Sequence, residues 1–173
     1  MLYNTIVSLA LFGAAFAAPV AKRDLQTIQT SIAAVGTALT ALDTSIKAIQ
    51  GPADTMKVLG MSQMVNQALT DATTKITATQ PITLTDALSL QQSAQTLTTT
   101  ATTTVTDLIA KKAIISQAGA QAMTLQNLMQ QKTASDALAK AVTAKVPANV
   151  QTIAQQQTAM ISTALDKGIA AFK

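Results

Sequence analysis

The chain has 173 residues, of which 49% are hydrophobic but only 2% aromatic and 12% charged, and its formal net charge is +4. It contains no Cys, His or Glu, which excludes disulfides, thiolate or imidazole metal sites and catalytic triads built on His. Because the Lys and Asp residues are scattered and aromatic stacking platforms are scarce, we expect no nucleic-acid binding, no metal or other cofactor and no enzymatic activity.

The first residues are typical of an export signal. An apolar segment over residues 6–12 precedes a small-x-small pattern that ends at Ala17, so we expect a signal peptide over residues 1–17. The basic pair Lys22 and Arg23 predicts a short propeptide over 18–23, the alternative being two exposed basic residues without a processing role. No later segment has about eighteen uninterrupted apolar residues, so we expect no transmembrane segment.

The rest of the chain, residues 24–173, is predicted to be a single domain whose first helix covers about 24–50. Apolar residues in this stretch recur at alternating gaps of three and four, which places them on one face of a helix. They are Leu25, Ile28, Ile32, Val35, Leu39, Leu42, Ile46 and Ile49. Gly51 and Pro52 follow as a helix stop. This apolar stripe must be buried, either against neighbouring helices or against an external apolar partner.

Two further helices are predicted between residues 52 and 115. One begins near 52–54, where Asp54 suits the positive end of the helix dipole. The next follows Pro81, has Thr83 and Asp86 as a weak capping box and extends to Ile115. Eight Thr lie between residues 96 and 106. We interpret this stretch as helical, the alternative being an exposed loop that carries O-linked sugars.

Two more helices complete the prediction, one over about 118–145 and the last from Pro147, which is suited to a first helical position. No strand pattern of comparable length occurs, and the connections are short. The sequence therefore predicts an all-α fold, an up-down bundle of about five long amphipathic helices.

The candidate binding residues are apolar side chains on the helix faces, including methionines. Met is adaptable and suits variable apolar surfaces, although it also fills gaps in ordinary cores. The candidates for contact with a lipid or an apolar surface are Leu25, Ile28, Ile32, Val35, Leu39, Met56, Met64, Leu97, Leu128, Met129 and Met160.

Taken together, the export signal, the basic pair, the Ala/Thr/Gln-rich helices and the step from Lys145 through Pro147 into a last helix resemble a known family. The chain resembles the fungal hydrophobic surface-binding protein A family, which is related to secreted cell-wall galactomannoproteins. The resemblance implies a non-catalytic protein. Some members adsorb to hydrophobic solids and help recruit polyester-degrading enzymes, and related domains hold fatty acids within a helical bundle.

We therefore expect a secreted, extracellular protein, either free or associated with the cell wall, that binds hydrophobic surfaces, fatty acids or other lipids and has a secreted hydrolase as a further partner. The ligand could lie inside the bundle, or the bundle could open on a surface. The alternative is a structural or adhesive wall mannoprotein with an O-glycosylated Thr segment. A membrane-active protein is a second rival, which the weak positive charge disfavours.

Overall fold

A computed structural model describes residues 17–173, which form helices joined by short connections. In chain order these elements are α1 (Ala17–Lys47), the 3₁₀ turn η1 (Pro52–Asp54), α2 (Thr55–Thr77), α3 (Leu84–Ala110), α4 (Lys112–Gln117), α5 (Gln121–Thr143) and α6 (Ala148–Phe172). The described part contains no strand. The predicted all-α bundle with five long helices is thereby confirmed, and the short α4 is an addition to it.

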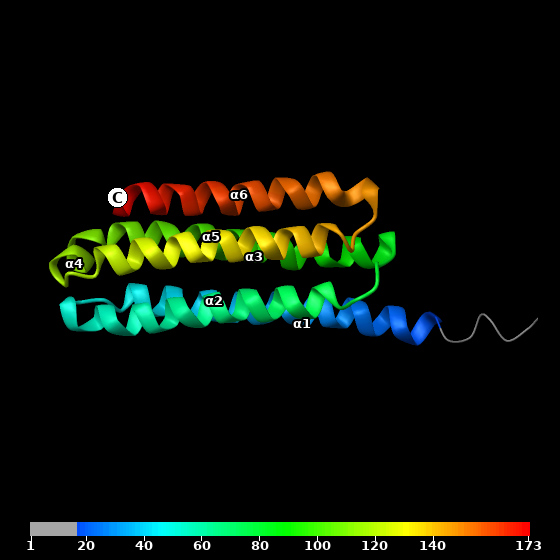
Figure 1. The fold of residues 1–173 in the computed structure, drawn as a ribbon, viewed down its shortest axis with the longest axis horizontal. Coiled ribbons are helices and arrows are strands. Elements are labelled where there is room, and N and C mark those ends of the chain that lie inside the picture. The colour runs from blue at the N-terminus through cyan, green and yellow to red at the C-terminus, as the bar shows by residue number, and fades with distance from the viewer. Residues whose placement is uncertain (1–16) are drawn as a thin grey trace, which may run out of the picture.

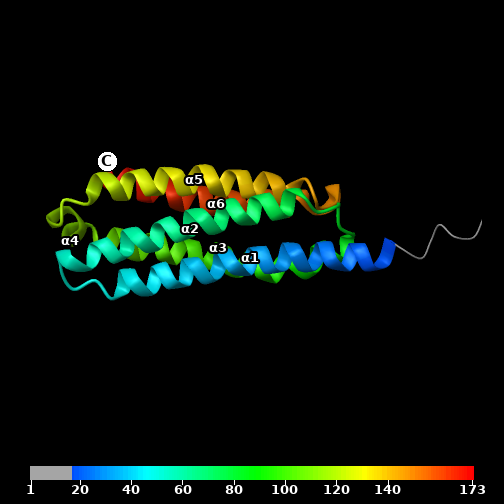
Figure 2. The ribbon, with the colours of Figure 1, turned by 60° about the horizontal axis from the view of Figure 1, so that its bottom comes forward.

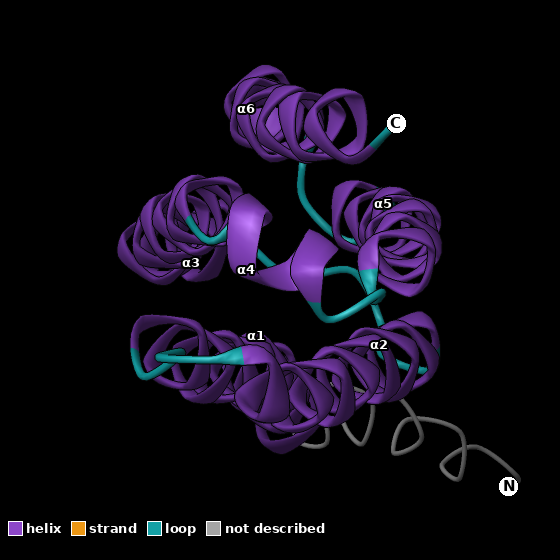
Figure 3. Cartoon of the chain, turned by 90° about the vertical axis from the view of Figure 1, so that its left-hand side faces the viewer, coloured by secondary structure: helices purple, strands orange, loops and turns teal. Residues whose placement is uncertain are grey.

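The long helices lie side by side along one axis and alternate in direction, with α1, α3 and α6 running one way and α2 and α5 the other (Figures 1 and 2). Viewed end-on they form three layers (Figure 3). Helices α1 and α2 make the first layer, α3 and α5 the second, and α6 lies alone against α3 and α5. One face of α6 therefore covers the bundle and the opposite face meets solvent.

The apolar stripe of α1 forms much of the core, as its spacing predicts. From Ile28 onward every member is at most 9% exposed, and only Leu25, near the start of the stripe, is half-buried. Ile28 and Ile46 are fully buried. The stripe is thus satisfied by neighbouring helices, because α1 packs against both α2 and α3.

The Thr-rich stretch is helical and lies inside α3, so the alternative of an exposed loop is wrong. Hydroxyl groups that could disturb the helix are used within it. Those of Thr99, Thr100, Thr102 and Thr106 each donate to the carbonyl oxygen four residues earlier, at 2.9–3.1 Å. Because each hydroxyl finds a partner on its own helix, the Thr residues continue the helix rather than end it.

Two predicted boundaries need correction near the turn between α3 and α5. The predicted third helix does not extend to Ile115 but ends at Ala110, and Lys111 leaves helical geometry with φ −93° and ψ 5°, while its Nζ donates to the carbonyl oxygen of Ile49 at 2.9 Å. Ile115 instead belongs to α4, where it is fully buried. The next helix begins at Gln121 rather than 118, because Gly119 takes a positive φ of 68° that ends α4.

Of the predicted capping box at the start of α3, the N-cap bond forms, and the Thr83 hydroxyl also donates to Oδ2 of Asp86 at 2.7 Å. Thr83 accepts a hydrogen bond from the backbone N–H of Asp86 at 3.2 Å and starts α3. The Oδ2 atom of Asp54 accepts from the backbone N–H groups of Gln50 and Gly51 at 2.9 and 3.1 Å, and these bonds lower the pKa of the Asp54 carboxyl.

The predicted signal peptide over 1–17 lies almost wholly outside the described residues, of which Ala17 is the first. Lys22 and Arg23 are exposed in the first turns of α1. Cleavage after either site stays a prediction.

Candidate functional site

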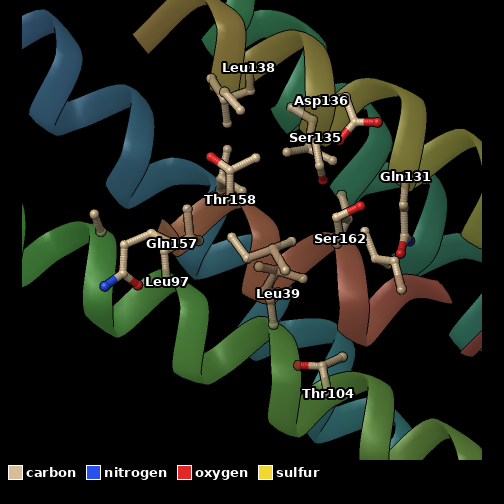
Figure 4. A pocket seen from close by; sticks show the side chains of 18 of the residues that line it. Leu39, Leu97, Thr104, Gln131, Ser135, Asp136, Leu138, Gln157, Thr158 and Ser162 are labelled. Atoms are coloured by element: carbon tan, nitrogen blue, oxygen red, sulfur yellow. The ribbon is translucent and has the colours of Figure 1, made fainter. Parts of the chain in front are cut away.

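A cavity of about 120 Å³ lies in the middle of the bundle, and all five long helices contribute to its wall. Most lining side chains are aliphatic, and Figure 4 shows how they converge from the different helices. The aliphatic lining comprises Ile32, Val35, Leu39, Leu42, Val65, Leu69, Ala94, Leu97, Ala101, Val105, Leu108, Leu128, Leu138, Ala139, Val142, Ala154, Ile161 and Leu165. Such a space suits an apolar ligand of small cross-section.

The cavity exists because the first half of α6 packs loosely. No residue between 148 and 163 is buried, whereas Ala164, Leu165, Gly168 and Phe172 in the second half are. Ala and Gln dominate the first half, so it brings few large apolar side chains to the interface. Space therefore remains beneath α6, as expected where small side chains face an apolar wall.

The second half of α6 is held closely, which fixes the position of the helix. A Cβ atom added at Gly168 would lie 3.0 Å from Cγ1 of Val105 and 3.3 Å from Cδ1 of Leu128. Beyond it, Phe172 is 1% exposed, and its carbonyl oxygen accepts a hydrogen bond from Nε2 of Gln121 at 3.1 Å. Helix α6 is thus anchored at its end and less constrained over the cavity.

Polar groups gather on the side of the cavity where α5 meets α6. Nζ of Lys132 donates to Oγ of Ser162 at 2.5 Å and to Oδ2 of Asp166 at 3.0 Å. Ser162 lines the cavity, and the Lys132 side chain is 29% exposed. Nearby, Gln131 is 5% exposed and makes only a long contact of 3.5 Å to the carbonyl oxygen of Ser62. The apolar interior therefore has a polar edge, where Lys132 is paired with Asp166 and where Asp136 also lines the cavity.

Among the predicted binding residues, the structure brings five together on the cavity wall. These are Ile32, Val35, Leu39, Leu97 and Leu128. Ile28 is fully buried and Leu25 half-buried, and both lie away from the cavity.

The four predicted methionines, Met56, Met64, Met129 and Met160, are 53–68% exposed and do not line the cavity. They could reach a ligand only on the outer surface, so their role in binding stays a prediction.

Sequence reasoning missed the small and polar lining residues, above all Ala94, Ala101, Ala154, Gln131 and Ser162. One signal could have pointed to them. The stripe of the last helix has few large aliphatic residues in its first half, so its buried face cannot fill the space it covers. A helix of that composition at the surface of a bundle is a reasonable place to look for a cavity.

The described residues hold no group of three or more Asp, Glu, His or Cys side chains placed to share a metal ion. Over the same residues, none of the helices combines the length and the apolar character needed to cross a bilayer.

Comparison with known proteins identifies the family. Residues 25–144 match the family described as Hydrophobic surface binding protein A. The chain is 38% identical over 173 residues to Cell wall mannoprotein 1 of Aspergillus flavus, and 30% identical over 168 residues to Cell wall mannoprotein 1 of Aspergillus fumigatus. The chain therefore belongs to the hydrophobic surface-binding protein A family, as its resemblance predicts.

These two matches cover 100% and 97% of this chain but only 63% and 58% of the relatives' own lengths. Among solved structures, the fold is similar to ligand binding domain 1 of the MP1 protein of Penicillium marneffei, which was solved in complex with arachidonic acids. The TM-score is 0.85 at 27% identity, and the match covers 87% of this chain and 99% of that one.

Proposed function

We propose that this protein binds a long-chain fatty acid in the cavity beneath α6. The observation that carries the proposal is an apolar cavity of about 120 Å³, walled by all five long helices and bordered by one lysine. The similar domain of MP1 was solved with arachidonic acids, which supports the same ligand class here.

Burial of the alkyl chain would supply the affinity. Each methylene group moved from water into an apolar site contributes about 0.8 kcal/mol, so ten buried methylenes contribute about 8 kcal/mol before the costs of ordering the ligand. Few charged groups need to lose water, because most of the lining is aliphatic and Asp136 is its only charged residue.

A long chain needs more room than the cavity offers. For comparison, an engineered cavity of about 150 Å³ in another protein accommodates benzene. Binding therefore requires a small outward shift of the first half of α6, which has the least packing to lose because none of residues 148–163 is buried. A shift across the helix axes leaves the level of each residue along those axes unchanged. The anchor at Gly168 and Phe172 would keep the helix attached during this movement.

The carboxylate of the ligand would lie at Lys132 and Ser162. A carboxylate must stay hydrated or find a charged partner, and Lys132 is bonded to a residue of the cavity wall while remaining partly exposed. Its present partner, Asp166, is 60% exposed, and such surface ion pairs contribute at most about 1 kcal/mol. Exchange of Asp166 for a ligand carboxylate would thus cost little.

Titration of the delipidated protein with hexadecanoic acid in a calorimeter tests the proposal. We expect saturable binding, together with a rise in melting temperature that depends on ligand concentration. Retention of fatty acid through purification, detected by mass spectrometry of an organic extract, would support the same conclusion. Absence of heat, of any melting shift and of extracted lipid would refute it.

A second function, adsorption to apolar solids, is favoured by the large apolar side chains on the surface. Eight large hydrophobic residues among those described are at least 37% exposed, including Met56, Met64 and Met160. Because burial of apolar area drives such adsorption, attachment to wax or polystyrene should persist in molar salt. Release by salt would instead indicate attachment through Lys.

The cellular context is part of the proposal. Export and association with the cell wall are supported by the wall mannoproteins among the relatives. Recruitment of a hydrolase and O-glycosylation of the Thr segment stay predictions. The Thr side chains at 99, 102, 103 and 106 are exposed on α3, where a sugar could be attached. The intact mass of secreted protein would reveal such sugars.

A further inference from the structure

A second cavity of about 60 Å³ adjoins the first at the end of the bundle where α3 and α6 begin. Its wall is again mostly aliphatic and includes Leu90, Val146 and Val150. Two of its residues reach the surface, since Leu88 is 50% and Ile153 37% exposed. The second cavity is therefore an apolar space with one side near solvent.

Five residues line both cavities and mark the boundary between them. They are Ile32 on α1, Ala94 on α3, Val142 on α5, and Ala154 and Gln157 on α6. Four long helices thus contribute to one ring of side chains. We call these five residues the junction ring.

The helix register places the members of the junction ring at one level. Helices α5 and α6 run in opposite directions, and Leu128 lies against Gly168 while Lys132 bonds to Asp166. Because the helices are antiparallel, each step forward along α5 corresponds to a step backward along α6, and this places Val142 opposite Ala154. Helices α3 and α6 run in the same direction with Val105 against Gly168, so Ala94 lies at the level of Gln157.

The side chains of the junction ring are smallest on α3 and α6. Ala94 and Ala154 bring only a methyl group each, from α3 and from α6, whereas Ile32 and Val142 bring branched side chains. An alkyl chain that passes from one cavity to the other would therefore pass beside the two alanines. A larger side chain at either alanine would narrow that passage.

Distances along the helices convert the position of the junction ring into a chain length. Ser162 and Ala154 are eight residues apart on α6, or about 12 Å at about 1.5 Å per residue. An extended polypeptide advances about 3.5 Å over three backbone bonds, or about 1.2 Å per bond, and we use the same value for an extended alkyl chain. A chain of about 11 carbons therefore reaches from Ser162 to the junction ring. Beyond the ring, the second cavity extends for about 6 Å along α6 and about 10 Å along α3. This length accommodates about 5 to 8 further carbons of the alkyl chain.

We propose that the junction ring sets the chain length that this protein prefers. The ring lets unbranched acids of about 16 to 19 carbons extend into the second cavity, and Ala94 and Ala154 are the specificity-determining residues. This inference rests on the proposed fatty acid binding. It adds that the second cavity receives the methyl end of the chain.

The substitutions Ala154→Leu and Ala94→Leu test the proposal, because each adds three carbon atoms at the ring. Ala159→Leu is the matched control on the exposed face of α6. Decanoic, dodecanoic, tetradecanoic and hexadecanoic acids are titrated into each protein below their micelle concentrations, and circular dichroism with thermal melting checks that each variant is folded. Affinity of the unsubstituted protein should rise about fourfold per methylene up to hexadecanoic acid.

In the two ring variants this rise should stop near 12 carbons, with hexadecanoic acid bound at least tenfold more weakly than by the control and decanoic acid within twofold of it. Equal affinities of ring variants and control at every length would overturn the proposal, as would equal losses at every length in a folded ring variant. Absence of binding by the unsubstituted protein would instead refute the proposed function itself.

Discussion

Filling the cavity should have opposite effects on stability and on binding. Ala101 is 7% exposed and lines the cavity from α3, so Ala101→Leu places three more carbon atoms in that space. Cavities cost about 24 cal/mol per Å³, and about 120 Å³ therefore costs the ligand-free protein about 3 kcal/mol. A leucine that fills a third to a half of the space should recover about 1 to 1.5 kcal/mol, or about 2 to 6 °C in melting temperature.

Urea unfolding and thermal melting of the delipidated variant measure the gain, and calorimetry with hexadecanoic acid measures the expected loss of affinity. The control is Ala110→Leu at the exposed end of α3, which should leave both quantities nearly unchanged. A variant destabilised by about 1 to 3 kcal/mol would mean that the space is already filled. A stabilised variant with full affinity would mean that the ligand binds elsewhere.

Three further predictions concern single side chains. Phe172→Ala should lower the free energy of unfolding by about 3 to 5 kcal/mol in urea titrations, because this ring is 1% exposed and anchors α6. Lys132→Met should weaken hexadecanoic acid binding by about tenfold or more, with the binding of hexadecanol unchanged, since only the acid carries a charge. Asp54→Asn should lower the free energy of unfolding at neutral pH. The pKa of Asp54 in the folded protein lies below the ordinary value of 3.8. The ionised carboxylate therefore stabilises the folded protein above pH 3.8, and this stabilisation is lost as the pH falls through the lowered pKa. If the Asp54→Asn variant were less stable than the unsubstituted protein by the same free energy at neutral pH and in strong acid, the last prediction would be contradicted.

The fold was predictable because its determinants are local. The sequence has an unbroken three-four spacing from Leu25 to Ile49, and such spacing leaves one face to bury, although α1 itself ends at Lys47 and not near residue 50. Pro52 begins η1 and Pro81 lies shortly before α3, whereas Pro147 is the N-cap of α6 rather than the first helical residue that the sequence predicts. The break at Lys111 was missed because no Gly or Pro marks it in the sequence, and the hydrogen bond of Lys111 to the carbonyl oxygen of Ile49 at 2.9 Å is a tertiary contact that periodicity cannot predict.

The site was predictable only in part. Aliphatic residues such as Val35 and Leu128 line the cavity, but periodicity cannot distinguish a side chain that faces empty space from one that is fully packed. The methionines were weighted for their adaptability, yet Met64 and Met129 are exposed on the outside of their helices. The cavity depends instead on what α6 lacks, which is a large apolar side chain at positions such as Ala154.

Fatty acid binding beneath α6 requires that the alkyl chain lie inside the bundle, which a crystal structure with hexadecanoic acid would reveal. We expect density for an extended chain between α6 and the layer of α3 and α5, in contact with Leu97 and Leu128, with the carboxylate at Lys132. A chain bound on the outer surface against Met64 or Met129, with the cavity beneath α6 unchanged, would contradict it.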